Sequence, residues 1–519
     1  MKQTPRVAQT PLPAVSPGLR RFLYATAAVT GAAVMIVEIL GARMLSPYIG
    51  TSHFVWTAQI AVTLVALACG YYVGGRLADR SQNLSVLYWS LFAAALWLVA
   101  LVKFCEPVSY WCLDFNLVAG SLLAAALLFF VPLALLAMTG PFLVRILTAD
   151  VDGVGGQVGR LTAVGTLGSF VGTMLIGYVM LPLLPNSRSM QLTALALGLL
   201  GAVYFLVFRR RAAAAAVTVI ALGGATWLAG RAGPPVHAHA TEIFSGNSPF
   251  GEIKVFDYNP SFRLYANDNL TQNVYDPTRR QSAYLFTHML AGLARAYTLD
   301  VRDVLCIGLG VGLVPMDFVQ DGARVDAVEI NPAIVPVAEK FFGLEPAKMA
   351  ITIDDGRHFL NRCERQYDVV VLDAFLGDSS PSHLMTREAF QAVRRVLRPG
   401  GTLVINLYPA RLEPGRDFFP ASLVDTLRTV FPGVRVHEGA NQLFIAATDR
   451  AQPEFVHAPD FARMHPAIVG EARAAFANRI YLEPGHGQVL TDDFNPVEFY
   501  DARNREEARR ELLRWAKTL

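Results

Sequence analysis

The hydrophobic and polar positions of the chain follow two patterns, and the change between them comes near residue 232. Before that point, apolar residues continue for about 20 positions at a time between short polar connections. After it, apolar runs are short, rich in β-branched residues, and interrupted by glycine, proline and charged positions. The first pattern predicts helices that span a membrane, and the second predicts the strands and helices of a soluble fold.

The N-terminal pattern predicts a membrane domain over residues 22–232, after a polar, proline-rich tail at residues 1–21. Its length allows about seven membrane-spanning helices. The predicted spans are Phe22–Leu40, Val55–Gly75, Leu84–Val102, Leu117–Met138, Ala163–Leu184, Met190–Phe208 and, as the weakest, Ala212–Gly230. Arginines gather in the connections on the tail's side of the membrane, at Arg76, Arg80, Arg145, Arg160 and Arg209–Arg211. The positive-inside rule therefore predicts a cytoplasmic tail.

Alternating apolar and polar residues follow the membrane region. Ser248–Phe256 and Phe262–Tyr265 alternate as antiparallel strands do, with a turn between them. We expect a small N-terminal β-domain at residues 243–275, followed by an α/β Rossmann-like domain at residues 276–519.

The α/β region repeats an order of buried strand, then glycine or acid, then helix. The segments that carry this order are Val304–Leu313, Val325–Ile330, Ile353–Gly356 and Tyr367–Asp373. The carboxyl ends of parallel strands converge on one crevice, so polar residues at these ends are expected to share a site. The residues of this candidate site are Gly308, Gly310, Gly312, Glu329, Asp355, Gly356 and Asp373.

The residue types at these strand ends fit a nucleoside without phosphates. The Gly308–Gly312 turn lets the backbone approach a ligand, but Leu313 breaks the dinucleotide pattern G-x-G-x-x-G. The Glu329 carboxylate can accept hydrogen bonds from both hydroxyls of a ribose, and Asp355 can accept one from an adenine amino group. The combination predicts a nucleoside-sulfonium site of the S-adenosylmethionine type.

Composition and charge narrow the function further. Hydrophobic residues make up 53% of the 519 residues and charged residues only 17%, which excludes a wholly soluble protein. The net charge of +3 comes without a basic-aromatic stripe, so no nucleic-acid partner is expected. The five cysteines show no metal-ligand spacing, and we expect no metal site.

Several short motifs of the second half resemble those of the spermidine synthase (polyamine aminopropyltransferase) family, over residues 243–450. Gly308–Gly312 resembles the family's glycine turn, and the turn Arg398–Gly401 before an apolar strand is typical of class I methyltransferase-like sheets. The other matching motifs are Asp268–Gln272, Thr287–His288, Val328–Ile330, Asp355–Gly356 and Val371–Asp373. With its hydrophobic first half, the chain resembles the membrane-fused members of this family.

The resemblance implies transfer of an aminopropyl group from decarboxylated S-adenosylmethionine to a diamine such as putrescine, giving spermidine and methylthioadenosine. It implies that Asp373 is the catalytic base, and that Asp378 and Asp268 hold the distal ammonium of the diamine. It also assigns the substrate-binding positions to Gln272, His288 and Gly251. The donor is a substrate, so no tightly bound cofactor is implied, and the partners expected are small molecules, the lipid bilayer and a second copy of the chain in a homodimer.

The sequence departs from the family pattern at the amine end of the site. Val311 stands in the glycine turn where the family usually has an aspartate, Ser282–Tyr284 replaces a Tyr-His/Gln-Glu run, and Gly251 replaces an early glutamine. Two alternatives therefore stay open. One is a methyltransferase that uses intact S-adenosylmethionine, and the other is a polyamine transporter or sensor with a non-catalytic synthase-like domain.

The nucleoside donor also bears on topology, because it is made in the cytosol. The second half is therefore expected at the cytoplasmic face of the cell membrane. Seven full spans after a cytoplasmic tail would place it on the opposite face. We therefore expect one weak segment, Ala212–Gly230 above all, to be re-entrant or interfacial, or the count of spans to be otherwise off by one.

Overall fold

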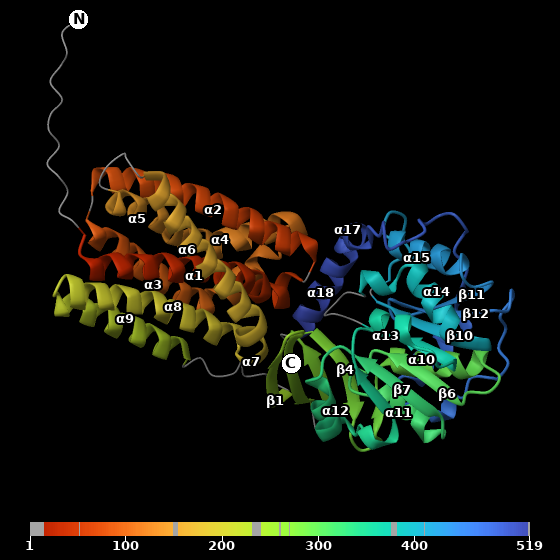
Figure 1. The fold of residues 1–519 in the computed structure, drawn as a ribbon. Helices are drawn as coiled ribbons and strands as arrows, with labels where there is room; N and C mark the ends of the chain where they lie inside the picture. Colours follow the sequence, from red (N-terminus) through yellow and green to blue (C-terminus); the bar gives the residue numbers. More distant parts are fainter. Residues whose placement is uncertain are drawn as a thin grey trace, which may run out of the picture. The chain divides into compact units, whose positions relative to one another are not determined.

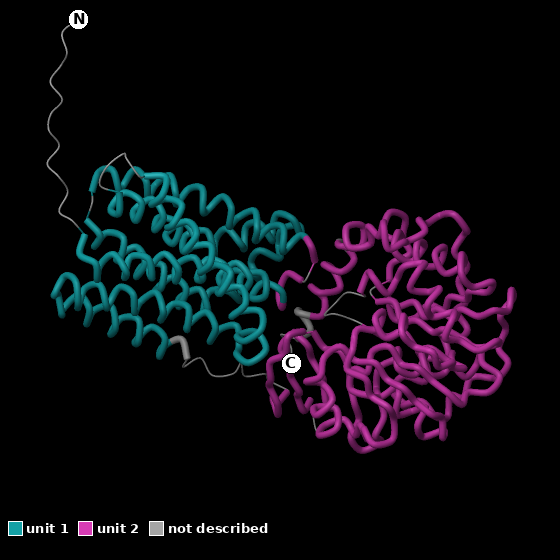
Figure 2. The backbone as a smooth tube through the Cα atoms, viewed as in Figure 1, with its two compact units in different colours: residues 1–46, 54–234 teal, residues 47–53, 235–519 magenta. Residues whose placement is uncertain are grey.

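The structure is a computed structural model of the chain. It describes residues 15–50, 52–81, 83–148, 154–230, 240–258, 261–268, 270–374, 381–408 and 410–516. The chain divides into two compact units, one of residues 1–46 and 54–234 and the other of residues 47–53 and 235–519 (Figure 2).

The first unit is helical (Figure 1). Its helices are α1 (Pro17–Ile49), α2 (His53–Arg80), α3 (Leu84–Cys112), α4 (Leu117–Ala137), α5 (Thr139–Leu147), α6 (Val154–Leu175), η1 (Ile176–Met180), α7 (Leu181–Leu183), α8 (Asn186–Val203), η2 (Tyr204–Phe208) and α9 (Ala212–Gly230).

Six stretches of the described helices, rather than seven, are long and apolar enough to cross a membrane. They are Pro17–Ile49, His53–Arg80, Leu84–Cys112, Leu117–Leu147, Val154–Leu183 and Asn186–Phe208. The seventh predicted span is helical as well, but its apolar part, Ala212–Leu228, is shorter than the about 20 residues that a bilayer requires.

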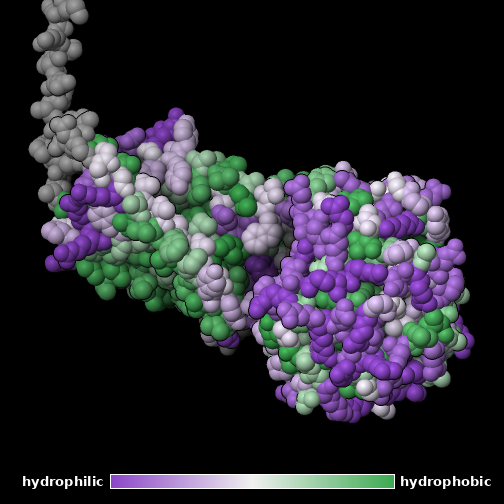
Figure 3. All heavy atoms as spheres, turned by 45° about the vertical axis from the view of Figure 1, so that its right-hand side comes forward, coloured by the Kyte–Doolittle hydropathy of each residue, from purple (hydrophilic) through white to green (hydrophobic). Residues whose placement is uncertain are grey.

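Small residues let the helices of this unit approach closely while apolar side chains face outward. A Cβ atom on Gly168 of α6 would lie 2.0 Å from the carbonyl oxygen of Ala28 in α1, so only glycine fits there. Large apolar side chains such as Leu64, Leu167 and Ile220 are exposed. Figure 3 shows hydrophobic residues over much of the visible face of this unit and mainly hydrophilic ones over that of the second unit.

The second unit begins with a five-stranded antiparallel sheet in the order β1-β2-β3-β4-β5. Its strands are β1 (Ala240–Ser248), β2 (Gly251–Tyr258), β3 (Phe262–Asn267), β4 (Leu270–Asp276) and β5 (Gln281–Ser282). A hairpin divides the predicted strand Ser248–Phe256, because Gly251 adopts a φ of +130° that residues with a side chain rarely adopt.

An eight-stranded sheet follows, in the order β13-β11-β12-β10-β9-β6-β7-β8. Strands β10, β9, β6, β7 and β8 are parallel, and β12 runs antiparallel between β10 and β11. The strands are β6 (Asp303–Ile307), β7 (Arg324–Glu329), β8 (Ala350–Ile353), β9 (Tyr367–Leu372), β10 (Leu397–Leu407), β11 (Gly433–Gly439), β12 (Gln442–Thr448) and β13 (Arg479–Ile480). This is the expected Rossmann-like, class I methyltransferase-type arrangement. Strand order reverses between β6 and β9, which is where such sheets bind ligands.

Helices cover both faces of the large sheet and form one hydrophobic core on each face. On one face, Met289, Val314 and Val337 pack from α10, α11 and α12, and on the other Leu360 and Phe390 pack from α13 and α14. The helices of this unit are α10 (Leu285–Tyr297), α11 (Leu313–Gln320), α12 (Ile334–Phe342), η3 (Pro346–Lys348), α13 (Gly356–Arg362), η4 (Ser382–Leu384), α14 (Arg387–Val396), α15 (Phe418–Arg428), η5 (Phe461–Arg463), α16 (Val469–Ala477), α17 (Val497–Tyr500) and α18 (Ala502–Ala516).

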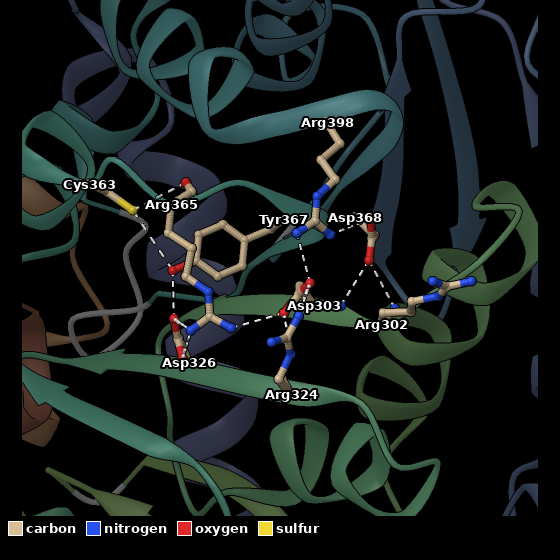
Figure 4. Close-up of polar contacts among 9 residues, drawn as sticks. All are labelled: Arg302, Asp303, Arg324, Asp326, Cys363, Arg365, Tyr367, Asp368 and Arg398. Carbon is tan, nitrogen blue, oxygen red and sulfur yellow. Dashed lines mark hydrogen bonds and ion pairs between the residues drawn. The ribbon is translucent and has the colours of Figure 1, made fainter.

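A buried carboxylate ties the amino ends of the central strands together (Figure 4). Asp303, which starts β6 and is only 1% exposed, accepts hydrogen bonds from Arg324, Arg365 and Arg398 at 2.9, 2.9 and 2.8 Å. Arg398 also donates to Asp368 at the start of β9, at 2.8 Å. This cluster lies away from the carboxyl ends of the same strands, where a site can form.

Candidate active site

One cavity of about 760 Å³ lies at the carboxyl ends of the parallel strands. The strand order places its polar groups in a row along the sheet edge, from β8 through β7, β6 and β9 to β10. In that order the row is Asp355, Glu329, Gly308 and Gly310 of the glycine turn, Asp373 and Asn406, and all of them line the cavity. Adjacent strands are about 4.8 Å apart, so the row is long enough for an extended ligand.

The glycine turn and the end of β9 are in direct backbone contact. Gly308 has a φ of +96°, and a Cβ atom built on it would lie 2.2 Å from the carbonyl oxygen of Asp373. Gly310 also lines the cavity. Gly312 is not among the cavity residues: it precedes α11 with a φ of +82°, and a Cβ there would meet Leu344 at 2.5 Å. The turn thus requires glycine for approach as well as for conformation.

Glu329 joins the end of β7 to the glycine turn. Its Oε2 accepts hydrogen bonds from the backbone N–H groups of Leu309 and Gly310 at 3.0 and 3.4 Å, and its Oε1 accepts one from Asn331 at 2.8 Å. Burial raises the pKa of Glu329, and these hydrogen bonds oppose that shift. Each carboxylate oxygen has two lone pairs, so with three of the four engaged by the backbone Oε1 retains one for a ligand hydroxyl.

Asp355 caps helix α13 as well as lining the cavity. Its Oδ1 accepts from the backbone N–H groups of Arg357 and His358 at 2.8 and 3.1 Å, and its Oδ2 lies 2.9 Å from His383 Nε2. Burial acts to raise the pKa of Asp355, but these hydrogen bonds outweigh it and the pKa is lowered. Gly356 follows, where a Cβ would meet Ile307 at 2.5 Å.

Asp373 directly follows β9, and of the polar side chains in the described part of the chain, that of Asn406 hydrogen-bonds to it. Burial among apolar strand residues raises its pKa to about 6, against a hydrogen bond from Asn406 Nδ2 to Oδ1 at 3.1 Å. A carboxyl group with this pKa accepts a proton efficiently near neutral pH. Asn406 Oδ1 is buried and has no hydrogen-bond partner among the described residues.

Comparison with known proteins identifies the type of domain that contains this site. Residues 284–407 match the profile of the spermine/spermidine synthase domain, and this stretch contains the glycine turn, Glu329, Asp355, Asp373 and Asn406. The C-terminal part of the chain carries a spermine/spermidine synthase domain.

Curated relatives of the synthase domain include enzymes of two kinds. A polyamine aminopropyltransferase from Vibrio vulnificus is 30% identical over 181 residues, which cover 33% of this chain and 60% of that protein. A putrescine N-methyltransferase from Nicotiana attenuata is 24% identical over 169 residues, which cover 31% of this chain and 44% of that protein. The chain thus spans less than two thirds of the length of either relative.

The chain is similar to solved structures as well. A probable spermidine synthase from Corynebacterium glutamicum superposes with a TM-score of 0.39 at 17% identity, covering 50% of this chain and 97% of that one.

The synthase domain brings some of the remaining predicted residues into the cavity and leaves others outside it. Gln272 lines the cavity, whereas Gly251, Asp268 and His288 do not. Asp268 Oδ1 accepts the backbone N–H of Glu252 at 2.8 Å and so stabilises the turn before β4. Asp378 lies outside the described residues.

His288 lies in another part of the fold. Its Nε2 is 2.7 Å from the Ser282 carbonyl oxygen, and the ring lines a smaller cavity of about 330 Å³. A substrate-binding role for His288, Asp268 or Gly251 stays a prediction that the observed geometry does not favour.

Carboxamide side chains form a part of the cavity wall that sequence analysis did not identify. Asn267, Asn273, Asn406 and Gln442 line the cavity, and the side-chain oxygen of each is buried without a hydrogen-bond partner among the described residues. The signal in the sequence was faint: Asn406 is the one polar residue in the apolar run Leu403–Leu407.

Proposed function

We propose that the synthase domain is an aminopropyltransferase, which moves the aminopropyl group of decarboxylated S-adenosylmethionine to an amine such as putrescine. The observation that carries this proposal is that Glu329 and Asp373 line one cavity at the ends of β7 and β9, the two strands on either side of β6 and its glycine turn. Glu329 can accept a hydrogen bond from a ribose, and Asp373 can accept a proton from an amine. One cavity thus offers a group to the donor and a group to the acceptor.

In this proposal the ligands lie in the order of the groups along the sheet edge. Adenine falls at Asp355, ribose at Glu329, the sulfonium and its aminopropyl arm at the glycine turn, and the acceptor amine at Asp373 and Asn406. The carbon that reacts then lies between the glycine turn and Asp373, which are in backbone contact at Gly308.

In the proposed reaction the acceptor nitrogen attacks the arm carbon that is bonded to sulfur. The C–N bond forms as the C–S bond breaks, and its electron pair goes to sulfur, so that neutral methylthioadenosine leaves. The proton released from the nitrogen goes to Asp373. The unpartnered Asn406 Oδ1 is placed to accept a second N–H of the amine, which would direct the lone pair toward the carbon.

A second candidate is methyl transfer from intact S-adenosylmethionine to an amine, with adenosylhomocysteine as the product. Val311 in the glycine turn favours it, because an apolar side chain that is 1% exposed offers no charge to the arm that carries the aminopropyl amine. The sequence similarity to a putrescine N-methyltransferase also supports methyl transfer.

The two candidates are separated by product analysis. The full chain, purified in detergent, is incubated with putrescine and either sulfonium donor. Methylthioadenosine that is lost in Asp373→Asn supports aminopropyl transfer, and adenosylhomocysteine supports methyl transfer. Donor binding without either product supports a sensor or transporter.

We also propose that the helical unit is a multi-pass anchor in the cell membrane and that the synthase domain lies in the cytoplasm. Six spans after a cytoplasmic tail return the chain to the cytoplasmic side, which agrees with the arginine distribution. A fluorescent protein fused after Leu519 should fluoresce, and alkaline phosphatase fused there should be inactive. The reverse result would refute this placement.

A further inference from the structure

We propose that Asn273 binds the amine end of the sulfonium donor, and that it does so by hydrogen bonds to its neutral carboxamide. This inference rests on the proposed function and specifies how its donor is selected. Asn273 lines the cavity, is only 7% exposed, and its Oδ1 has no hydrogen-bond partner among the described residues. A buried acceptor without a donor is unfavourable, so a ligand that brings an N–H group to it is favoured.

The position of Asn273 matches the donor's arm. It lies on β4, opposite Tyr265 of β3, and so reaches the cavity from the five-stranded sheet. Its Nδ2 is 4.0 Å from the place where a Cβ on Gly310 would stand. Gly310 in turn donates its backbone N–H to Glu329, and Gly308 touches Asp373. Asn273 therefore lies over the turn between the ribose position and the base, where the arm extends from sulfur.

The neighbouring side chains at the turn are either apolar or already accept hydrogen bonds from the backbone. Val311 is buried with 1% exposure and offers no hydrogen bond, and both oxygens of Glu329 accept backbone N–H groups. Of the described groups at the turn, the carboxamide oxygen of Asn273 is the one that is buried and unpartnered.

A carboxamide makes this position permissive toward two donors. Its oxygen accepts from an ammonium group, and its Nδ2 donates to a carboxylate, so it can meet either decarboxylated or intact S-adenosylmethionine. A carboxylate in its place would accept from the ammonium more strongly and would repel the carboxylate of the intact donor. With asparagine at position 273 the site thus admits both donors, whereas a carboxylate there would favour the decarboxylated one.

The test measures dissociation constants by calorimetry on the full chain in detergent, with three ligands. Methylthioadenosine lacks the arm and reports the nucleoside site alone, and the decarboxylated and intact donors add the arm without and with a carboxylate. The variants are Asn273→Asp and Asn273→Ala. Asn361→Asp, on the exposed side of α13, is the matched control for the added charge.

For Asn273→Asp we expect binding of the decarboxylated donor to tighten about tenfold, binding of the intact donor to tighten less or to weaken, and binding of methylthioadenosine to stay within about twofold. For Asn273→Ala we expect the decarboxylated donor to bind about fivefold more weakly, again with methylthioadenosine unchanged. Asn361→Asp should change none of the three.

Equal changes for methylthioadenosine and the decarboxylated donor would overturn the inference, since Asn273 would then support only the fold or the nucleoside site. No change for any ligand in either variant would overturn it as well. If the unaltered chain bound none of the three ligands and formed no product, the proposed function itself would fail and this inference with it. Thermal unfolding of Asn273→Asp shows whether the variant is folded, and Asn273→Ala supplies the same comparison without a new charge.

Discussion

Asn406 Nδ2 donates a hydrogen bond to Asp373 Oδ1 at 3.1 Å, across two neighbouring parallel strands. The bond favours the charged form of Asp373 and so opposes the effect of burial, which raises the pKa of Asp373 to about 6. The pair therefore keeps Asp373 ionised at neutral pH while leaving its basicity well above that of an exposed aspartate.

Removing that donor should move the acid limb of the pH–rate profile. Asn406→Leu takes away a hydrogen bond to a charged group, worth about 1.5–3 kcal/mol, so the apparent pKa of kcat/KM should rise by at least about one unit. Asn406→Gln keeps an amide donor and should shift it less. An acid limb that stays in place in Asn406→Leu would mean that the observed pKa does not belong to Asp373.

Asp373 itself should be required for turnover and not for nucleoside binding. Asp373→Asn removes the proton acceptor and should lower kcat by about 10²–10⁴-fold, while methylthioadenosine binds as before. In the unaltered chain the base acts as a carboxylate, so the rate should fall as the pH drops through about 6. Asp493→Asn, at an exposed position, is the matched control. Undiminished turnover in Asp373→Asn would exclude its role as the base.

Two glycines with similar backbone angles separate conformational strain from close approach. Gly308 and Gly322 have φ of +96° and +81°, but a Cβ on Gly308 would lie 2.2 Å from Asp373 O, whereas a Cβ on Gly322 meets nothing within 4 Å. Gly322→Ala should cost about 1–2 kcal/mol of folding free energy and leave activity intact. Gly308→Ala should cost more and should lower kcat at least about tenfold, because the backbone at Asp373 must shift. Denaturant unfolding and steady-state kinetics on both variants make the comparison.

The Asp303 cluster should affect stability and leave the site's chemistry unchanged (Figure 4). Asp303→Asn leaves three arginines facing a neutral group, and because those arginines are partly exposed we expect a loss of about 2–3 kcal/mol. Methylthioadenosine affinity should be unchanged in the folded variant.

The same cluster has a defined pH dependence. Burial acts to raise the pKa of Asp303, but hydrogen bonds from Arg398, Arg365 and Arg324 outweigh it, and the pKa is lowered. Its contribution to stability is therefore complete above the unfolded pKa of about 3.9 and is lost as the pH falls through the lower folded value. Unfolding at pH 7 and at about pH 3 should show a smaller difference between Asp303→Asn and the unaltered chain at the lower pH.

The strand-end residues could be predicted from sequence because the carboxyl ends of parallel strands lie together at one edge of the sheet. Short apolar runs that end in glycine or acid place Gly308, Glu329 and Asp373 at one sheet edge, and all three line the same cavity. The carboxamides could not be predicted in this way. Asn273 and Asn406 are single polar residues within strands, and their importance depends on which neighbouring strand or turn they face, which no local pattern encodes.

Motif matching was weakest where the site depends on side-chain direction. Asp268 is the first residue of a matching motif. Its positive φ of 48° and the hydrogen bond that it accepts from Glu252 N nevertheless direct its side chain to the hairpin. Hydropathy gave Ala212–Gly230 as the weakest of seven candidate spans, and its apolar part, Ala212–Leu228, is shorter than the six long apolar helical stretches of the described residues.

The close approach of Gly308 to Asp373 has an evolutionary consequence. Since no side chain fits between Gly308 of the glycine turn and the backbone of Asp373, a substitution in one of these two parts requires a compensating change in the other. New acceptor preferences in related proteins should therefore arise by substitution in the walls supplied by β3, β4 and α16, which border the same cavity without sharing that backbone contact.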